Sequence, residues 1–125
     1  MSDLVTWLRA QMDADERSAM IAAGPIGHNW QADGGSVFAE HPTDEIVDYA
    51  GQAAEHIAVH DPARVLRQVA AMRAIVDAYE RAYHGDGIDE TEAQHARRVA
   101  LEETVEALAT VYTDRDAYNP DWAPE

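Results

Sequence analysis

The stretch AEHIAVHDPARVLR, residues 54–67, contains the clearest helix boundary in the chain. Proline disfavours helical geometry at the residue before it, so a helix should end near His60. Proline also suits the first position of a helix, and aspartate is a good N-cap. The sequence therefore predicts a short helix over about 53–60 and a long helix that begins at Pro62 with Asp61 as its cap.

The helix that begins at Pro62 carries an apolar face whose residues are spaced by four and three in turn, as in a heptad seam. A helix over about 90–112 repeats this spacing. The seam residues are Val65, Val69, Met72, Val76, Tyr79 and Tyr83 in the first helix and Leu101, Val105, Leu108 and Tyr112 in the second. Because the connector is short, we expect an antiparallel helical hairpin over about 62–83 and 90–112.

The connector HGDGIDE, residues 84–90, contains signals for a helix end and a helix start. Gly85 suits the position after a helix, where the backbone often turns left-handed. Asp89 is a candidate N-cap, and Glu92 lies three residues later, as in a capping box. The last helix is therefore predicted to begin directly after Asp89.

The remaining segments predict a third helix and a small sheet. Apolar residues spaced four apart mark a helix from Ser2 or Asp3 to about Ala22, namely Leu4, Leu8 and Met12. Two short strands flank a turn signal at residues 33–36, because glycine accepts a positive φ. Residues 45–49 are either a third strand or the start of a helix.

We therefore expect an α+β fold that is mainly α: a helical bundle with a long antiparallel hairpin and a small antiparallel sheet at about 29–49. The length of 125 residues indicates a single domain. We place this domain at 1–113 and a C-terminal tail at 114–125. Tyr118 and Trp122 either fold back onto the hairpin or leave the tail loose.

The charge balance restricts the classes of partner. The chain has 24 acidic residues, nine arginines and no lysine, which gives a net charge of −15. This charge opposes direct binding to a phosphate backbone or to an anionic membrane surface. It favours solubility or a basic protein partner. No secretory signal pattern is visible at the N-terminus, so we expect a cytoplasmic protein.

His56 and His60 are four residues apart and therefore share one face of the short helix. A helix presents two imidazoles to zinc at this spacing, and Asp61 is the candidate third ligand. However, the HExxH pattern is absent, because apolar residues separate the histidines. His60 also continues an apolar series with Ala53 and Ile57. The alternative is therefore that the imidazoles are partly buried and bonded to backbone or to a carboxylate.

Arg64 and Arg67 fall in the first turns of the long helix, near the positive end of its dipole. One interpretation is that they form an anion-binding site together with His60. The interpretation that we favour is that either arginine pairs with Asp61 or Glu55 and fixes the joint between the two helices.

Two pairs of carboxylates have the spacing that magnesium-dependent helical nucleotide pyrophosphatases use. Glu45 and Asp48 form the first pair, and Glu103 and Glu106 form the second, with Glu102 beside them. Here the two pairs come in the opposite order, and the first is not clearly helical. The alternative is that these carboxylates are solvated residues beside the apolar seam.

The central motif HIAVHDPARVLR resembles the signature of a small family of unknown function found in actinobacteria and their phages. The likeness extends to LVTWLRAQMDADE, to the tryptophan at position 30 and to ALATVYTDRDAYNPDWAPE. The resemblance implies cysteines between the long helix and the tail in many members of that family, whereas this chain has DGIDETEAQHARRVALEET there and no cysteine at all. The resemblance therefore implies a lineage, but no activity and no thiolate metal site.

Three functions remain open. The first, which we expect, is a non-enzymatic module that binds another protein, as a host or phage accessory protein or an inhibitor that mimics nucleic acid. The second is a zinc-binding protein or hydrolase centred on His56, His60 and Asp61. The third is a homodimer whose seams pair between chains. No catalytic residue is assigned, and the candidate binding residues are His56, His60, Asp61, Arg64 and Arg67.

Overall fold

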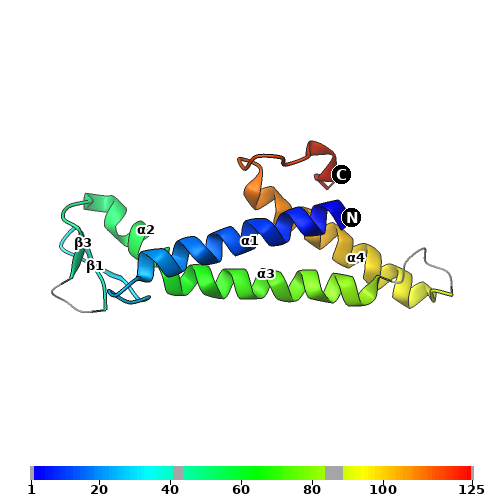
Figure 1. Cartoon of the computed structure of the whole chain (residues 1–125), viewed down its shortest axis with the longest axis horizontal. Coiled ribbons are helices and arrows are strands. Elements are labelled where there is room, and N and C mark those ends of the chain that lie inside the picture. The colour runs from blue at the N-terminus through cyan, green and yellow to red at the C-terminus, as the bar shows by residue number, and fades with distance from the viewer. Residues whose placement is uncertain (1, 41–43, 84–88, 125) are drawn as a thin grey trace. The chain divides into compact units, whose positions relative to one another are not determined.

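The computed structural model describes residues 2–40, 44–83 and 89–124, and these form a mainly α, α+β fold (Figure 1). The described helices are α1 (Ser2–Ala23), α2 (Ala54–Val59), α3 (Pro62–Ala82) and α4 (Glu92–Ala109). The strands are β1 (Gln31–Asp33), β2 (Ser36–Phe38) and β3 (Glu45–Val47), and three 3-10 turns are η1 (Gly51–Ala53), η2 (Thr110–Tyr112) and η3 (Pro120–Trp122). The predicted fold class is confirmed, and the ambiguous segment 45–49 begins as a strand.

The contacts of the chain group into two compact units. One comprises residues 13–69 and contains the sheet, and we call it the sheet unit. The other comprises residues 1–12 and 70–125 and contains α4, and we call it the hairpin unit. Each unit includes part of α1 and part of α3, and the two are described separately below.

In the sheet unit, β1, β2 and β3 form an antiparallel sheet in that order. The turn between β1 and β2 is Gly34-Gly35, whose φ angles of +59° and +83° explain why two glycines stand there. Helix α2 packs against β1 and β2. The core consists of Val37, Ala54 and Ala58, with Trp30, Ala32, Ile46, Val47, Ala50 and Ile57 packed around it. This small core fixes the position of the segment before Pro62.

In the hairpin unit, the predicted seams supply the buried residues. Leu4 and Leu8 of α1, Val76 and Tyr79 of α3, and Val105 of α4 are all nearly inaccessible to solvent. Tyr79 and Tyr83 share a cavity with Arg98 and Glu102, while Arg81 and Ala82 share another with Gln94 and Arg97. The end of α3 therefore lies beside the first half of α4, as expected for an antiparallel hairpin (Figure 1).

One seam residue departs from the prediction. Tyr83 is 50% exposed, and Ala82 is buried in its place. Tyr83 follows the last residue of α3, and a straight helix drifts from a strict seven-residue repeat over this length.

The start of α4 also differs from the prediction. The capping box is formed by Thr91 and Gln94, whose side chains each bond the other's backbone N–H. Asp89 instead adopts a left-handed backbone with φ of 68° and does not cap the helix. The predicted role of Gly85 lies outside the described residues.

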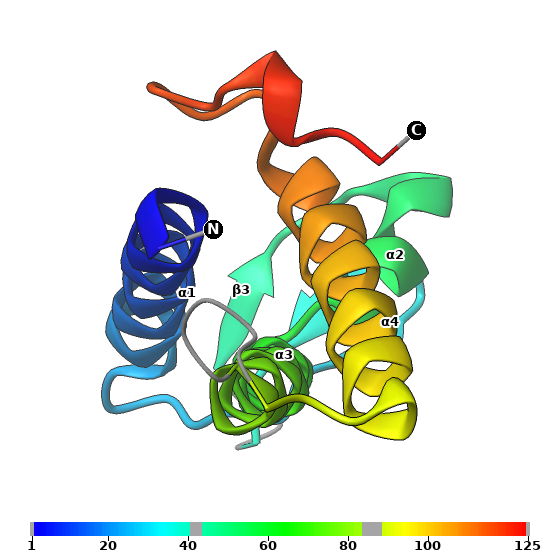
Figure 2. The same cartoon turned by 90° about the vertical axis from the view of Figure 1, so that its right-hand side faces the viewer.

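The C-terminal segment folds back within the hairpin unit (Figure 2). Trp7 of α1 donates an indole hydrogen bond to the carbonyl of Asp116, at 3.0 Å. Its ring contacts Tyr112, Tyr118 and Trp122, with ring centroids 5.3–6.4 Å apart. The tail is therefore held by aromatic contacts with α1, rather than only with the hairpin.

Across the described residues, none of the helices is both long and apolar enough to span a membrane.

Candidate functional site

Asp61 lies at the helix joint, which is the junction between α2 and α3 that the sequence predicts. Its side chain is buried, and one carboxylate oxygen accepts the backbone N–H of Arg64 at 2.9 Å. This is the predicted N-cap of α3. The other oxygen accepts the backbone N–H of Trp30 at 3.0 Å. Asp61 therefore joins the start of α3 to the segment that leads into β1.

A second carboxylate fixes the same segment. One oxygen of Glu40 lies within 3.2 Å of the backbone N–H groups of His28 and Asn29 and of the Asn29 side-chain amide. These donors, the side-chain amide first, lower the pKa of Glu40 below its usual range. The carbonyl of His28 in turn accepts the N–H of Ala63 in the first turn of α3. The polar groups of the joint are thus bonded to one another.

His56 and His60 do lie together, but not as predicted from the apolar series. Their ring centroids are 4.3 Å apart, and both residues are exposed. Nδ1 of His60 lies 2.8 Å from the His56 carbonyl, so this nitrogen is the one that donates. His60 ends α2 with a non-helical backbone, which is why helical spacing does not carry it into the core.

The remaining members of the predicted metal and anion sites are engaged differently. Both oxygens of Asp61 already accept backbone N–H groups, and the described part of the chain brings no three His, Asp or Glu side chains into a cluster suited to a metal ion. Arg64 and Arg67 are exposed, and neither pairs with Asp61 or Glu55 among the residues described. In the first turn of α3, the backbone N–H groups of Arg64 and Ala63 donate to the Asp61 carboxylate and to the His28 carbonyl.

The hairpin unit contains an open groove between α4 and the C-terminal segment, which we call the acidic groove. It has a volume of about 560 Å³ and is lined by Val99, Glu102, Glu103, Glu106, Asp121, Ala123 and Pro124. Four of these side chains are carboxylates, and the rest are apolar or small. The three glutamates lie on one face of α4, whereas Asp121 lines the groove only because the C-terminal segment folds back.

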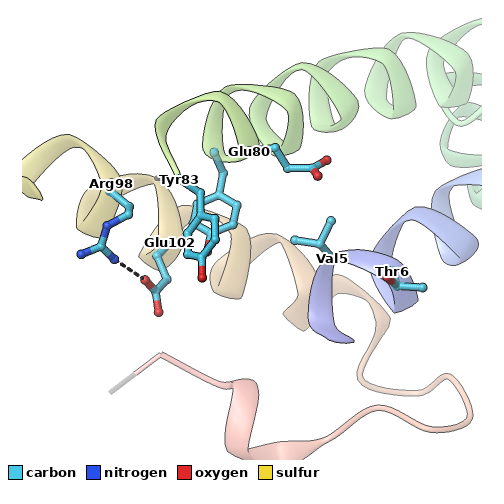
Figure 3. A pocket seen from close by; sticks show the side chains of 7 residues that line it. Val5, Thr6, Glu80, Tyr83, Arg98 and Glu102 are labelled. Carbon is cyan, nitrogen blue, oxygen red and sulfur yellow. Dashed lines mark ion pairs between the residues drawn. The ribbon is translucent and has the colours of Figure 1, made fainter. Parts of the chain in front are cut away.

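A second cavity of the hairpin unit, which we call the tyrosine pocket, has a volume of about 450 Å³ (Figure 3). It is lined by Val5, Thr6, Tyr79, Glu80, Tyr83, Arg98 and Glu102. Glu102 lines both this pocket and the acidic groove. Two aromatic rings, an arginine and two carboxylates therefore surround one space beside the groove.

Ion pairs shape the electrostatics of the tyrosine pocket. Arg98 donates through Nε and one terminal nitrogen to the two oxygens of Glu90, at 3.0 and 3.2 Å. The bonds from Arg98 lower the pKa of Glu90, whose side chain is only 4% exposed. The same arginine lies 3.5 Å from Glu102. Burial, with the nearby charge of Glu102, raises the pKa of Tyr79.

The two predicted carboxylate pairs do not form a matched helical set. Glu45 lies in β3, and Asp48 follows that strand, so the first pair is not helical. The Asp48 side chain hydrogen-bonds to Glu45 and raises its pKa. Glu102, Glu103 and Glu106 are helical and contribute to the acidic groove. The sequence pattern indicates these three glutamates as candidate site residues. It does not indicate Asp121, Tyr79 or Tyr83 as site residues, because their grouping depends on the folded tail and hairpin.

The comparisons with known proteins identify a protein family but no individual protein similar to this chain. Neither the curated proteins nor the solved structures yielded a match to this chain. A family model described as a family of unknown function, DUF6221, matches residues 1–124. The resemblance first seen in the motif at the helix joint thus extends along nearly the whole chain, and the protein belongs to this DUF6221 family.

Proposed function

We propose that this protein is a non-enzymatic module that binds a basic segment of another protein through the acidic groove. The observation that carries the proposal is the grouping of Glu102, Glu103, Glu106 and Asp121 around one open space. Apolar side chains line the same space, so a partner could bury the stems of basic side chains while their charges meet the carboxylates.

The net charge of the chain supports the same partner chemistry. At −15, the surface attracts basic proteins over long range and accelerates their encounter at low salt. Net charge alone, however, would attract a basic partner to any face. The test must therefore separate the groove from the total charge.

The test compares two double variants that remove the same number of negative charges. Glu103→Gln/Asp121→Asn neutralises two groove carboxylates, whereas Asp33→Asn/Glu55→Gln neutralises two exposed carboxylates of the sheet unit. The probe is a short peptide of alternating glycine and arginine residues, titrated by calorimetry at low salt. We expect the groove variant to weaken Kd about tenfold and the control variant to weaken it less than about threefold.

Equal losses in the two variants would show that only total charge matters, and the groove would then not be the binding site. Failure of the wild-type chain to bind the peptide would overturn the proposal itself.

A further inference from the structure

We infer that the tyrosine pocket receives the guanidinium group of an arginine in the basic partner. The inference rests on the proposed function and names the side chain that anchors the partner beside the acidic groove. Three features support it: the charges around the pocket, one tyrosine hydroxyl and one exposed ring.

The arginines around the pocket are outnumbered by carboxylates. The lining contains one arginine, Arg98, and two carboxylates, Glu80 and Glu102. Outside the lining, Glu90 also contacts Arg98, and Arg9 contacts both Glu80 and Asp77. The charge of Arg98 is held mainly by its two bonds to Glu90, which leaves Glu102 only the longer contact. One further cation would therefore be attracted to this space rather than repelled from it.

A tyrosine hydroxyl in the same space has no protein partner among the described residues. Tyr79 is 3% exposed and lines the pocket. Within the described residues, its hydroxyl makes no hydrogen bond. A phenol oxygen can accept a hydrogen bond, so this oxygen is suited to accept an N–H from a bound group.

The second tyrosine offers a ring face. Tyr83 is 50% exposed, and its ring centroid lies 6.1 Å from that of Tyr79, with the planes inclined by 39°. An exposed tyrosine face attracts a cation. A guanidinium is planar, so it can stack on this ring while its several donors reach Tyr79 and Glu102. A lysine ammonium is a compact point charge and cannot do both.

The experiment measures Kd for three peptides on the full chain: the glycine–arginine peptide, and the same peptide with lysine or with uncharged citrulline at each arginine. The variants are Tyr83→Leu, which removes the exposed ring, and Tyr79→Phe, which removes only the hydroxyl. Tyr49→Leu is the matched control, because Tyr49 is an exposed tyrosine of the sheet unit. Circular dichroism checks that each variant is folded.

We expect the wild-type chain to prefer arginine over lysine by about fivefold or more and to bind the citrulline peptide weakly. Tyr83→Leu should abolish this preference, Tyr79→Phe should reduce it, and Tyr49→Leu should leave it unchanged.

Equal binding of the arginine and lysine peptides by the wild-type chain would overturn the inference. An arginine preference that survives in both Tyr83→Leu and Tyr79→Phe would overturn it as well. In either case the proposed function would stand if the groove variant still weakened binding. If no peptide bound the wild-type chain, both the inference and the proposed function would be contradicted.

Discussion

The sheet unit and the hairpin unit use their polar residues in opposite ways. In the sheet unit, the carboxylates of Asp61 and Glu40 accept backbone N–H groups, so they complete the fold. In the hairpin unit, the carboxylates of Glu80 and Glu102 contact arginine side chains beside an open pocket. A carboxylate that replaces a missing backbone partner belongs to the architecture, whereas one that lines an open space remains accessible to a ligand.

The same contrast shows that Asp61, in the most distinctive motif of the sequence, serves the fold. HIAVHDPARVLR combines histidines, an aspartate and arginines, which are the residue types of many sites. The structure uses Asp61 as a cap and as a tie to Trp30. The acidic groove and the tyrosine pocket, at which we propose that a partner binds, lie in the other unit, where the sequence shows only an ordinary helical hairpin.

The largest expected effect is at Asp61. Asp61→Ala removes the N-cap of α3 and leaves the N–H of Trp30 without its acceptor. We expect a loss of about 2–3 kcal/mol in the free energy of unfolding, measured by urea denaturation. The control is Glu55→Ala, an exposed residue of the same unit, which should cost less than about 0.5 kcal/mol. Similar losses in the two variants would contradict an architectural role for the motif.

A smaller and more local effect is expected from Trp122→Ala in the hairpin unit. It removes ring contacts with Trp7 and Tyr118, at centroid distances of 5.3 and 5.8 Å. We expect a loss of about 1–2 kcal/mol. In NMR spectra, the indole N–H signal of Trp7 should shift, while that of Trp30, which bonds to Gly27, should not. Peptide binding should also weaken, because this segment supplies one wall of the acidic groove.

A Trp122→Ala protein whose Trp7 signal stays in place would show that the aromatic contacts do not hold the tail. A shift of the Trp30 signal as well would show that the change is not confined to the hairpin unit.

The smallest expected effects are pKa changes that compare a carboxylate in each unit. The pKa values of Glu40 and Glu90 both lie below the ordinary value of 4.5. Because folding lowers these pKa values, both carboxylates add stability above about pH 4.5, and this stability is lost as the pH falls through the lowered values. NMR titration of the carboxyl carbons measures each pKa directly.

Two variants test which hydrogen-bond donors lower the pKa values of Glu90 and Glu40. Arg98→Met should raise the pKa of Glu90 toward 4.5, because it removes the charged donor. Asn29→Ala should raise that of Glu40 by less, because the backbone donors of His28 and Asn29 remain. A larger rise at Glu40 than at Glu90 would contradict the distinction between the two units.

Local chemistry made much of the fold predictable. The break between α2 and α3 follows from the constraints of Pro62, and α1 follows from its apolar spacing. Thr91 and Gln94 have the spacing of a capping box, but so do Asp89 and Glu92, and the sequence prediction places the cap at Asp89. An error of this kind arises where two overlapping segments both have the spacing of a capping box.

The candidate site was much less predictable, because it depends on residues that are distant in sequence. The bond from Trp30 to Asp61 spans 31 positions, and no local pattern indicates it. The tyrosine pocket draws on α1, α3 and α4. Tyr83 was assigned to the core by its spacing, and only the observed end of α3 shows that it is half exposed.

The separation of Trp30 and Asp61 also has a consequence for the order of folding. The cap of α3 is satisfied locally by the N–H of Arg64, but the second oxygen of Asp61 finds its partner only after a long loop has closed. A peptide containing only α2 and α3 would therefore lack that bond and would have a weaker start to α3. The sheet and the first turn of α3 should consequently form in one cooperative step, with the loop closure as its entropic barrier.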